Sequence, residues 1–200
     1  PTSPMASSDI YGHIATVTGA TWGSQGRTFD GVDDKIELND DNVNSLMNFT
    51  ASDFSLIFWL NIDVLGAGDY RNIINRGVHT TDGWYIDARE STTLRFSTDQ
   101  AGVSQGVNFA DYFTTGVWIH GGVTRAGANA VIYKNGAQFA TSGGYANPTS
   151  NARPTRIGVY GNGTSNYMDG TIGQVWVYSR VLSASEVTQN YLATKWRYGL

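Results

Sequence analysis

The sequence has no cysteine among its 200 residues, only four prolines and only 15% charged residues. Without cysteine, neither a disulfide framework nor a zinc site built on thiolates is available. The thirteen lysines and arginines are scattered and the net charge is −4, which argues against a nucleic-acid partner. No apolar run is long enough to cross a bilayer, so membrane insertion is not expected.

Glycine and aromatic residues are abundant instead. The chain has 24 glycines and 12% aromatic residues, a mixture that suits short strands joined by tight turns around a sheet-on-sheet core. No linker-like tract or internal repeat divides the chain, so we expect one domain over residues 1–200. The chain begins with Pro1 rather than Met, as a trimmed piece does, and residues 1–10 are expected to be a flexible N-terminal segment.

Alternating apolar residues predict a series of strands. In Phe54–Ile62 both faces are apolar, which predicts a strand in the middle of a sheet. Asn135-Gly136 predicts a two-residue type I′ turn inside a hairpin over 131–139. The polar stretch 98–116 is expected to be a long surface excursion. Further strands are expected at 13–17, 36–38, 72–75, 84–88, 94–97, 118–124, 156–159 and 171–178.

One helix is predicted near the C-terminus. Ser183-Ala184-Ser185-Glu186 has the spacing of a capping box, with Ser183 as N-cap and Glu186 at the third helical position. Leu182 and Val187 stand where a hydrophobic staple would form. The apolar positions of this helix predict that one face lies against the sheets, and they are Val187, Tyr191, Leu192 and Trp196.

In this order, the segments resemble the laminin-G-like, concanavalin A-like jelly-roll superfamily. The resemblance runs from about Tyr11 to the C-terminus and rests on residues 29–34, 53–60, 83–86, 118–120, 133–136 and 169–186. It implies an all-β jelly-roll β-sandwich of two antiparallel sheets with a short C-terminal helix. Both ends of the chain are also similar to laminin-G-like modules of marine microbial and phage particle proteins. Because the fold carries lectins, adhesion modules, glycanases and virion proteins, the resemblance leaves function open.

Paired carboxylates of the kind that glycanases need are missing from the sequence pattern. Retaining glycosidases use two carboxyl groups about 5 Å apart. The chain has three glutamates, Glu37, Glu90 and Glu186, and none lies two or four residues from another. Asp87 and Glu90 have an odd spacing, which places them on opposite faces of a strand. We therefore predict a protein that is not an enzyme.

Histidine offers no catalytic or metal-binding pattern either. The three histidines are far apart and share no metal-ligand spacing. His120 follows Trp118 in an apolar strand, so we expect a structural role for it.

Four aspartates form a candidate calcium site. Carboxylates and loop carbonyls are the hard oxygen ligands that Ca²⁺ prefers. Two of the four precede glycine, and Asp-Gly pairs also make turns; the lack of a regular ligand spacing favours that plainer interpretation. The aspartates expected around a structural Ca²⁺ are Asp30, Asp33, Asp34 and Asp169.

Loop segments rich in aromatic and planar polar residues suggest sugar recognition. Flat rings stack on sugar faces, and amides and guanidinium groups bind hydroxyls. Taken singly, each such residue is more often an ordinary loop or core residue. The candidates for ligand binding are Tyr70, Arg71, Arg76, Trp84, Tyr160, Asn162, Asn166 and Tyr167.

The function predicted from these features is that of a non-catalytic extracellular module for carbohydrate binding or adhesion. Its partner would be a cell-surface or environmental glycan, met as part of a multimeric assembly. The alternative is a virion protein, such as a capsid decoration or fibre domain, that contacts other particle proteins. A glycoside hydrolase is the third class considered.

Overall fold

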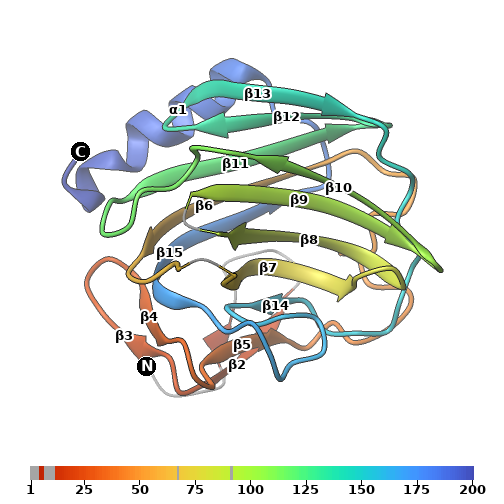
Figure 1. Cartoon of the computed structure of the whole chain (residues 1–200), viewed down its shortest axis with the longest axis horizontal. Coiled ribbons are helices and arrows are strands. Elements are labelled where there is room, and N and C mark those ends of the chain that lie inside the picture. The colour runs from red at the N-terminus through yellow and green to blue at the C-terminus, as the bar shows by residue number, and fades with distance from the viewer. Residues whose placement is uncertain (1–4, 7–11, 67, 91) are drawn as a thin grey trace.

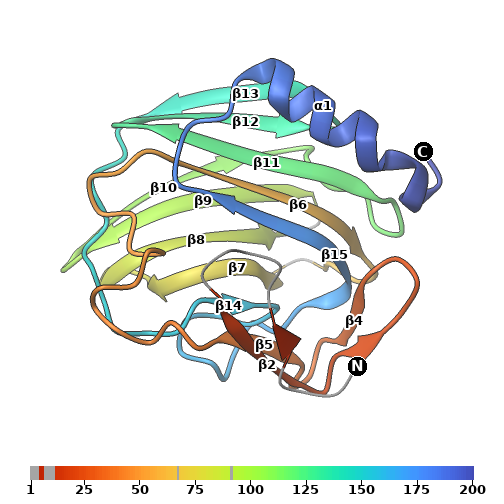
Figure 2. The ribbon, with the colours of Figure 1, turned by 180° about the vertical axis from the view of Figure 1, so that it is seen from behind.

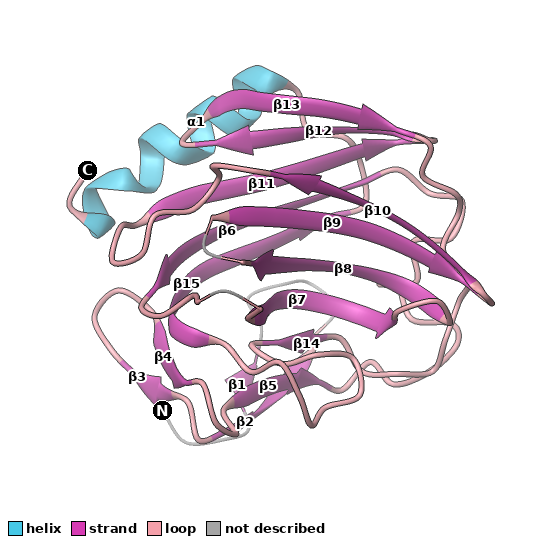
Figure 3. Ribbon diagram, in the orientation of Figure 1, coloured by secondary structure: helices cyan, strands magenta, loops and turns pink. Residues whose placement is uncertain are grey.

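Two antiparallel sheets stack face to face in this protein (Figures 1 and 3). The computed structural model describes residues 5–6, 12–66, 68–90 and 92–200. The eight-stranded sheet has the order β1 (Met5–Ala6), β2 (Ile14–Thr18), β5 (Lys35–Leu38), β14 (Arg156–Ile157), β7 (Tyr70–Val78), β8 (Asp82–Arg89), β9 (Thr93–Gln100), β10 (Val103–Phe109). The seven-stranded sheet has the order β13 (Ala137–Gly143), β12 (Asn129–Lys134), β11 (Ile119–Ala126), β6 (Phe54–Ile62), β15 (Asp169–Tyr178), β4 (Arg27–Asp30), β3 (Thr21–Trp22).

This arrangement confirms the predicted all-β jelly-roll sandwich. Apart from β1, the predicted N-terminal segment 1–10 lies outside the described residues.

Strand β6 lies inside its sheet, between β11 and β15, as its two apolar faces predict. Phe54 and Leu56 point into the core between the sheets. On the opposite face, Ile57 and Trp59 are fully buried although they point away from that core. The C-terminal helical segment covers them, and the ring of Tyr198 stacks on Trp59 with centroids 4.1 Å apart.

The helix begins where the sequence predicts. Helix α1 (Ala184–Thr194) is followed by a 3-10 turn, η1 (Lys195–Tyr198), and both lie outside the seven-stranded sheet (Figure 2). The predicted capping box is present. Ser183 Oγ accepts from the backbone N–H of Glu186, and the Glu186 carboxylate accepts from the backbone N–H of Ser183.

Of the four residues predicted to lie on the buried face of this helix, two pack against the sheet and two do not. Val187 is buried, and Tyr191 stacks on Trp59. Leu192 and Trp196, in contrast, are 54% and 75% exposed. Each residue turns a helix by about 100°, so the row through Val187 and Tyr191 faces the sheet while Leu192 points toward solvent.

The segment 98–116, predicted to be a long surface loop, contains a strand. The stretch 98–116 contains the end of β9 and all of β10, and the two strands pair along their whole length. Their two-residue turn ends at Gly102, whose φ is 76°. Strand β10 is an edge strand whose side chains are exposed or half-buried except at Phe109, so it lacks the apolar alternation that reveals buried strands. The predicted type I′ turn at Asn135 and Gly136 does have two positive φ values, 51° and 78°.

The aromatic core decides which side chains of β8 and β9 face outward. Trp84 and Phe96 point inward, and their rings lie 5.9 and 6.1 Å from that of Phe54. Because strand side chains alternate, the neighbours Tyr85 and Arg95 stand on the outer face of the eight-stranded sheet.

Candidate functional site

A shallow basin lies on this outer face. Its volume is about 310 Å³. Strands β7, β8 and β9, the turn between β7 and β8, and the loop between β14 and β15 provide its lining: Tyr70, His79, Tyr85, Asp87, Arg89, Arg95, Tyr160 and Asn166. The basin thus combines aromatic rings with guanidinium, carboxylate and amide groups on a hydrogen-bonded sheet.

The loop between β14 and β15 forms one wall of the basin and contributes Tyr160 and Asn166. The backbone N–H of His79 donates to the Tyr160 hydroxyl at 2.7 Å, which ties the loop to the end of β7. Gly161 lies against the same strand, and a Cβ there would come within 1.6 Å of the carbonyl oxygen of Gly77. Only glycine allows this approach, so the wall is held close to the sheet.

Asp87 and Arg89 form an ion pair in the floor. Arg89 Nε and Nη2 donate to Asp87 Oδ1 and Oδ2 at 2.9 and 3.1 Å. The guanidinium also lies over the ring of Tyr70. Burial raises the pKa of Asp87, and the bond from Arg89 opposes that rise. The pair keeps a buried carboxylate satisfied and fixes the Tyr70 ring at the rim.

Asp99 anchors a second polar network at the other end of the basin. Its oxygens accept from Ser97 Oγ at 3.0 Å and from the backbone N–H of Thr80 at 2.9 Å. His79 Nδ1 lies 3.5 Å from this carboxylate and 3.0 Å from the Tyr85 hydroxyl. Burial raises the pKa of Tyr85 to about 12, helped by the charge of Asp99, so this phenol is neutral at physiological pH.

Three of the predicted ligand residues, Tyr70, Tyr160 and Asn166, line the basin. They come from segments about 90 residues apart in the sequence, and the fold brings them together. Their role in binding stays a prediction.

Three others build the surroundings of the basin. Arg71 donates to the backbone carbonyl of Tyr167 at 3.2 Å and forms an ion pair with Asp69. Tyr167 in turn donates to a backbone carbonyl of its own loop. Asn162 Oδ1 accepts from the backbone N–H of Thr164 at 2.9 Å. These side chains hold the shape of the wall and do not line the basin.

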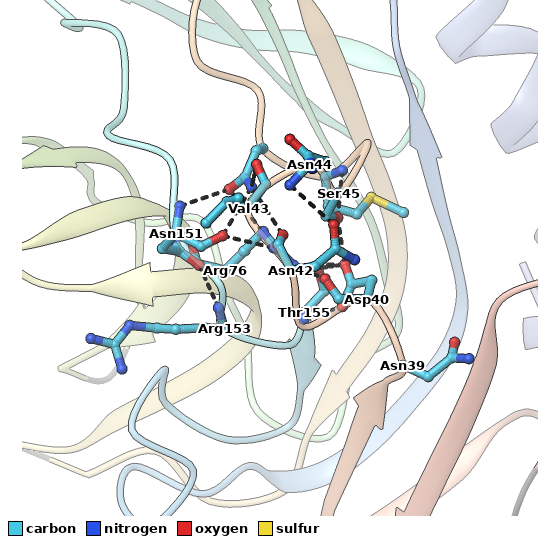
Figure 4. Close-up of polar contacts among 12 residues, drawn as sticks. Asn39, Asp40, Asn42, Val43, Asn44, Ser45, Arg76, Asn151, Arg153 and Thr155 are labelled. Atoms are coloured by element: carbon cyan, nitrogen blue, oxygen red, sulfur yellow. Dashed lines mark hydrogen bonds and ion pairs between the residues drawn. The ribbon is translucent and has the colours of Figure 1, made fainter.

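Arg76 and Trp84 are fully buried and present no surface to a ligand. Arg76 points from β7 into the loop that follows β5, where it forms an ion pair with Asp40 at 2.8 Å (Figure 4). It also donates to the carbonyl oxygens of Asn42 and Asn151. Trp84 belongs to the core. In the sequence, an arginine in a polar stretch looks like a binding residue. The fold shows that Arg76 instead cross-links two loops.

Five residues that line the basin were not predicted as ligand-binding residues from the sequence: His79, Tyr85, Asp87, Arg89 and Arg95. A signal for three of them does exist. In Trp84–Arg89 the apolar and polar positions alternate strictly, which places Tyr85, Asp87 and Arg89 on one outward face.

The aspartates of the proposed calcium site are partly brought together. Carboxylate oxygens of Asp30, Asp33 and Asp34 lie within 4.8 Å of one another. Asp169 is the cross-strand partner of Asp30. Burial and then the charges of Asp30 and Asp33 raise the pKa of Asp34. The donor set fits a hard cation. The same carboxylates also make the turn, since Asp30 Oδ1 accepts from the backbone N–H of Val32.

A second cavity, of about 670 Å³, lies between the two sheets. Strand β4 pairs with β15 only as far as Ile172, so the later part of β15 lacks a neighbour on that side among the described strands. Aliphatic side chains such as Ile36, Ile157 and Val175 line this cavity together with aromatic and polar ones such as Trp22, Arg27, Gln174 and Trp176.

The fold is a concanavalin A-like β-sandwich. Residues 29–188 match the model of the laminin-G domain family within the concanavalin A-like lectin/glucanase superfamily, and the chain belongs to that superfamily. No curated protein matches the chain.

Solved structures with a similar fold include binding domains of toxins. The receptor binding domain of botulinum neurotoxin D has a TM-score of 0.76 and 19% identity, covering 94% of this chain and 50% of that one. The ligand binding domain of botulinum neurotoxin serotype D in complex with N-acetylneuraminic acid has a TM-score of 0.74 and 16% identity, covering 94% and 48%. The binding domain of Paraclostridial Mosquitocidal Protein 1 has a TM-score of 0.65 and 18% identity, covering 88% and 45%.

This chain thus spans about half the length of the solved structures it matches. At these identities the likeness is one of fold. Within the described residues, no helix has the length and apolar character needed to traverse a membrane.

Proposed function

We propose that this chain is a non-catalytic carbohydrate-binding module that acts outside the cell and takes a sugar in the basin. The observation that carries the proposal is the lining itself. Tyr70 and Tyr160 supply aromatic surface, while Arg95 and Asn166 supply planar hydrogen-bonding groups. The sheet and a tethered loop hold these groups in place before a ligand arrives, which limits the entropy lost on binding.

The positions of the basin carboxylates support a binding role over hydrolysis. Asp87 faces Arg95 across β8 and β9, and Asp99 lies four residues further along β9. Four residues of a strand span about 13 Å. Glycosidases keep their two carboxyl groups about 5 Å apart when retaining and about 6.5–9.5 Å apart when inverting. Both oxygens of Asp87 are moreover bound by Arg89.

The proposal includes weak binding by a single copy. The basin is shallow and polar, so much of the contact energy is offset by desolvation. Display of several copies on one particle or in a tandem array would raise the affinity by avidity. The structure of a toxin domain with N-acetylneuraminic acid shows a sugar-type ligand on a related fold and supports the choice of ligand class.

A glycan array probed with a multivalent form of the protein tests this function. We expect a defined set of glycans to bind, and Tyr160→Ala to weaken that binding by removing the ring and the tether of its loop to β7, while the domain stays folded. Trp196→Ala is the matched control, because this ring is 75% exposed and lies over the other sheet. If no glycan binds the multivalent form, the proposal fails, and contacts with other proteins of a particle become the better interpretation.

A further inference from the structure

The arginines on this face of the eight-stranded sheet are not equivalent. Five of them lie on or beside the face, and four are held by carboxylates in these ion pairs: Arg71 with Asp69, Arg89 with Asp87, Arg153 with Asp82, and Arg156 with Glu37. Arg95 is the exception, since it forms no ion pair with any described residue. Its cross-strand partner is Asp87, whose carboxylate is itself bound by Arg89, so the guanidinium of Arg95 is the one in the basin lining without a carboxylate of its own among the described residues.

The Arg95 side chain is held flat. Its Cζ lies 5.2 Å from the centroid of the Tyr85 ring. On strand β10, Gly106 lies so close that a Cβ there would come within 2.1 Å of Arg95 Nε. One donor is used, because Nη2 donates to Ser104 Oγ at 3.0 Å. A guanidinium has five N–H donors, so most of this fork remains available to a ligand.

Neighbouring carboxylates are already satisfied. Both oxygens of Asp87 accept from Arg89, at 2.9 and 3.1 Å. The two oxygens of Asp99 accept from Thr80 and Ser97. The planar fork of Arg95 therefore has the geometry and the charge to bind an anion with two parallel hydrogen bonds.

We propose that the basin selects sugars that carry an anionic group, a carboxylate or a sulfate, and that Arg95 binds this group. The inference rests on the proposed function, because it requires that the basin binds glycans. Arg95 would then determine specificity, while the tyrosine rings hold the sugar face.

The test compares matched glycans that differ in charge alone. One arm uses an acidic oligosaccharide and its carboxyl-reduced counterpart; the other uses a sulfated oligosaccharide and its desulfated counterpart. Dissociation constants are measured by calorimetry at low and high salt. We expect the anionic member of at least one pair to bind about tenfold tighter, as a charge-assisted hydrogen bond implies, and the preference to shrink with salt.

Three variants connect the preference to Arg95. Arg95→Gln should abolish it, and Arg95→Lys should keep only part of it because the fork is lost. Gly106→Ala should reduce it by displacing the guanidinium while the charge remains. Arg197→Gln is the control, since it makes the same change of charge on η1 at the other sheet. Circular dichroism and thermal midpoints establish that each variant is folded.

Glycan binding without charge preference in either arm would overturn this inference and leave the proposed function standing. A preference that survives in Arg95→Gln would also overturn it. Absence of binding to every glycan would remove both proposals.

Discussion

Arg89 and Tyr70 lie in direct contact at the rim of the basin, with the Cζ of the guanidinium 4.6 Å from the centroid of the ring. The same guanidinium binds both oxygens of Asp87. Asp87 and Arg89, both on β8, thus position Tyr70, the first residue of β7. A cation therefore fixes the ring from one side.

Tyr70→Ala should weaken glycan binding about threefold to tenfold, which corresponds to the loss of one aromatic contact. Tyr70→Phe keeps the ring and should bind as the parent does. Since Tyr70 is half-buried at a strand end, both variants should melt within a few degrees of the parent. Equal dissociation constants for the parent and Tyr70→Ala would show that the ring does not contact the sugar.

Arg76→Met should destabilise the protein by about 3–5 kcal/mol, because it leaves the buried carboxylate of Asp40 without its cation. Adding Asp40→Asn to this variant should recover part of the loss. Denaturant unfolding of the parent, the two single variants and the double variant measures the coupling. If Arg76→Met lowers the free energy of unfolding by less than about 1 kcal/mol, the ion pair contributes little to stability.

Local sequence patterns correctly predicted much of the secondary structure of this protein. Strand Phe54–Ile62 and the capping box at Ser183 depend on neighbouring residues, and both are present in the structure. Strand β10 escaped prediction because an edge strand does not need apolar residues.

The candidate site was predicted only in part, for a different reason. Tyr160 and Asn166 become wall residues because their loop folds over strands that precede it by about 80 residues. No local pattern carries that information. Arg76 illustrates the converse, since its polar setting in the sequence resembles a ligand site and tertiary packing makes it an internal cross-link (Figure 4).

Ser183→Ala should lower the free energy of unfolding by about 1 kcal/mol, because the backbone N–H of Glu186 loses its acceptor. Glycan binding should remain intact, since the helix and the basin lie on different sheets. Ser179→Ala, at an exposed position just before the helix, serves as the control. An unchanged midpoint in denaturant would show that the cap adds nothing to stability.

His120 should make the protein less stable in mild acid. Its ring lies between Trp59 and Tyr191, with no hydrogen-bond partner for either ring nitrogen among the described residues. Burial lowers the pKa of His120 to about 4, below the value of about 6.5 in an unfolded chain. The unfolded state therefore takes up the proton first, and stability present above pH 6.5 is lost as the pH falls toward 4.

Unfolding free energies of the parent and His120→Leu, measured between pH 7 and pH 4, test this expectation. The parent should lose up to about 1.4 kcal/mol per pH unit more than the variant, which corresponds to one proton. Parallel curves would show that His120 titrates alike in both states.

Calcium should stabilise the fold without taking part in any chemistry. We propose that Asp30, Asp33 and Asp34 hold the ion, with Asp169 beside them. Burial, and then the charges of neighbouring aspartates, raise the pKa of Asp34 and of Asp169, and a bound cation would relieve the repulsion among these carboxylates. An ion that binds only the native state adds about 2.7 kcal/mol at a hundredfold excess over its dissociation constant. Melting in millimolar calcium should then exceed melting in EDTA by several degrees.

Asp33→Asn is the informative variant for this site. Asp33 is exposed and takes part in the turn through its backbone N–H, which donates to Asp30 Oδ1. The Asp34 carboxylate, in contrast, accepts from the backbone N–H of Asp30. The variant should therefore keep its stability in EDTA and lose the response to calcium. Asp111→Asn, an exposed residue with a φ of 58° that asparagine tolerates, should respond like the parent. Identical melting of the parent with calcium and with EDTA, and no metal by elemental analysis, would assign the aspartates to the turn alone.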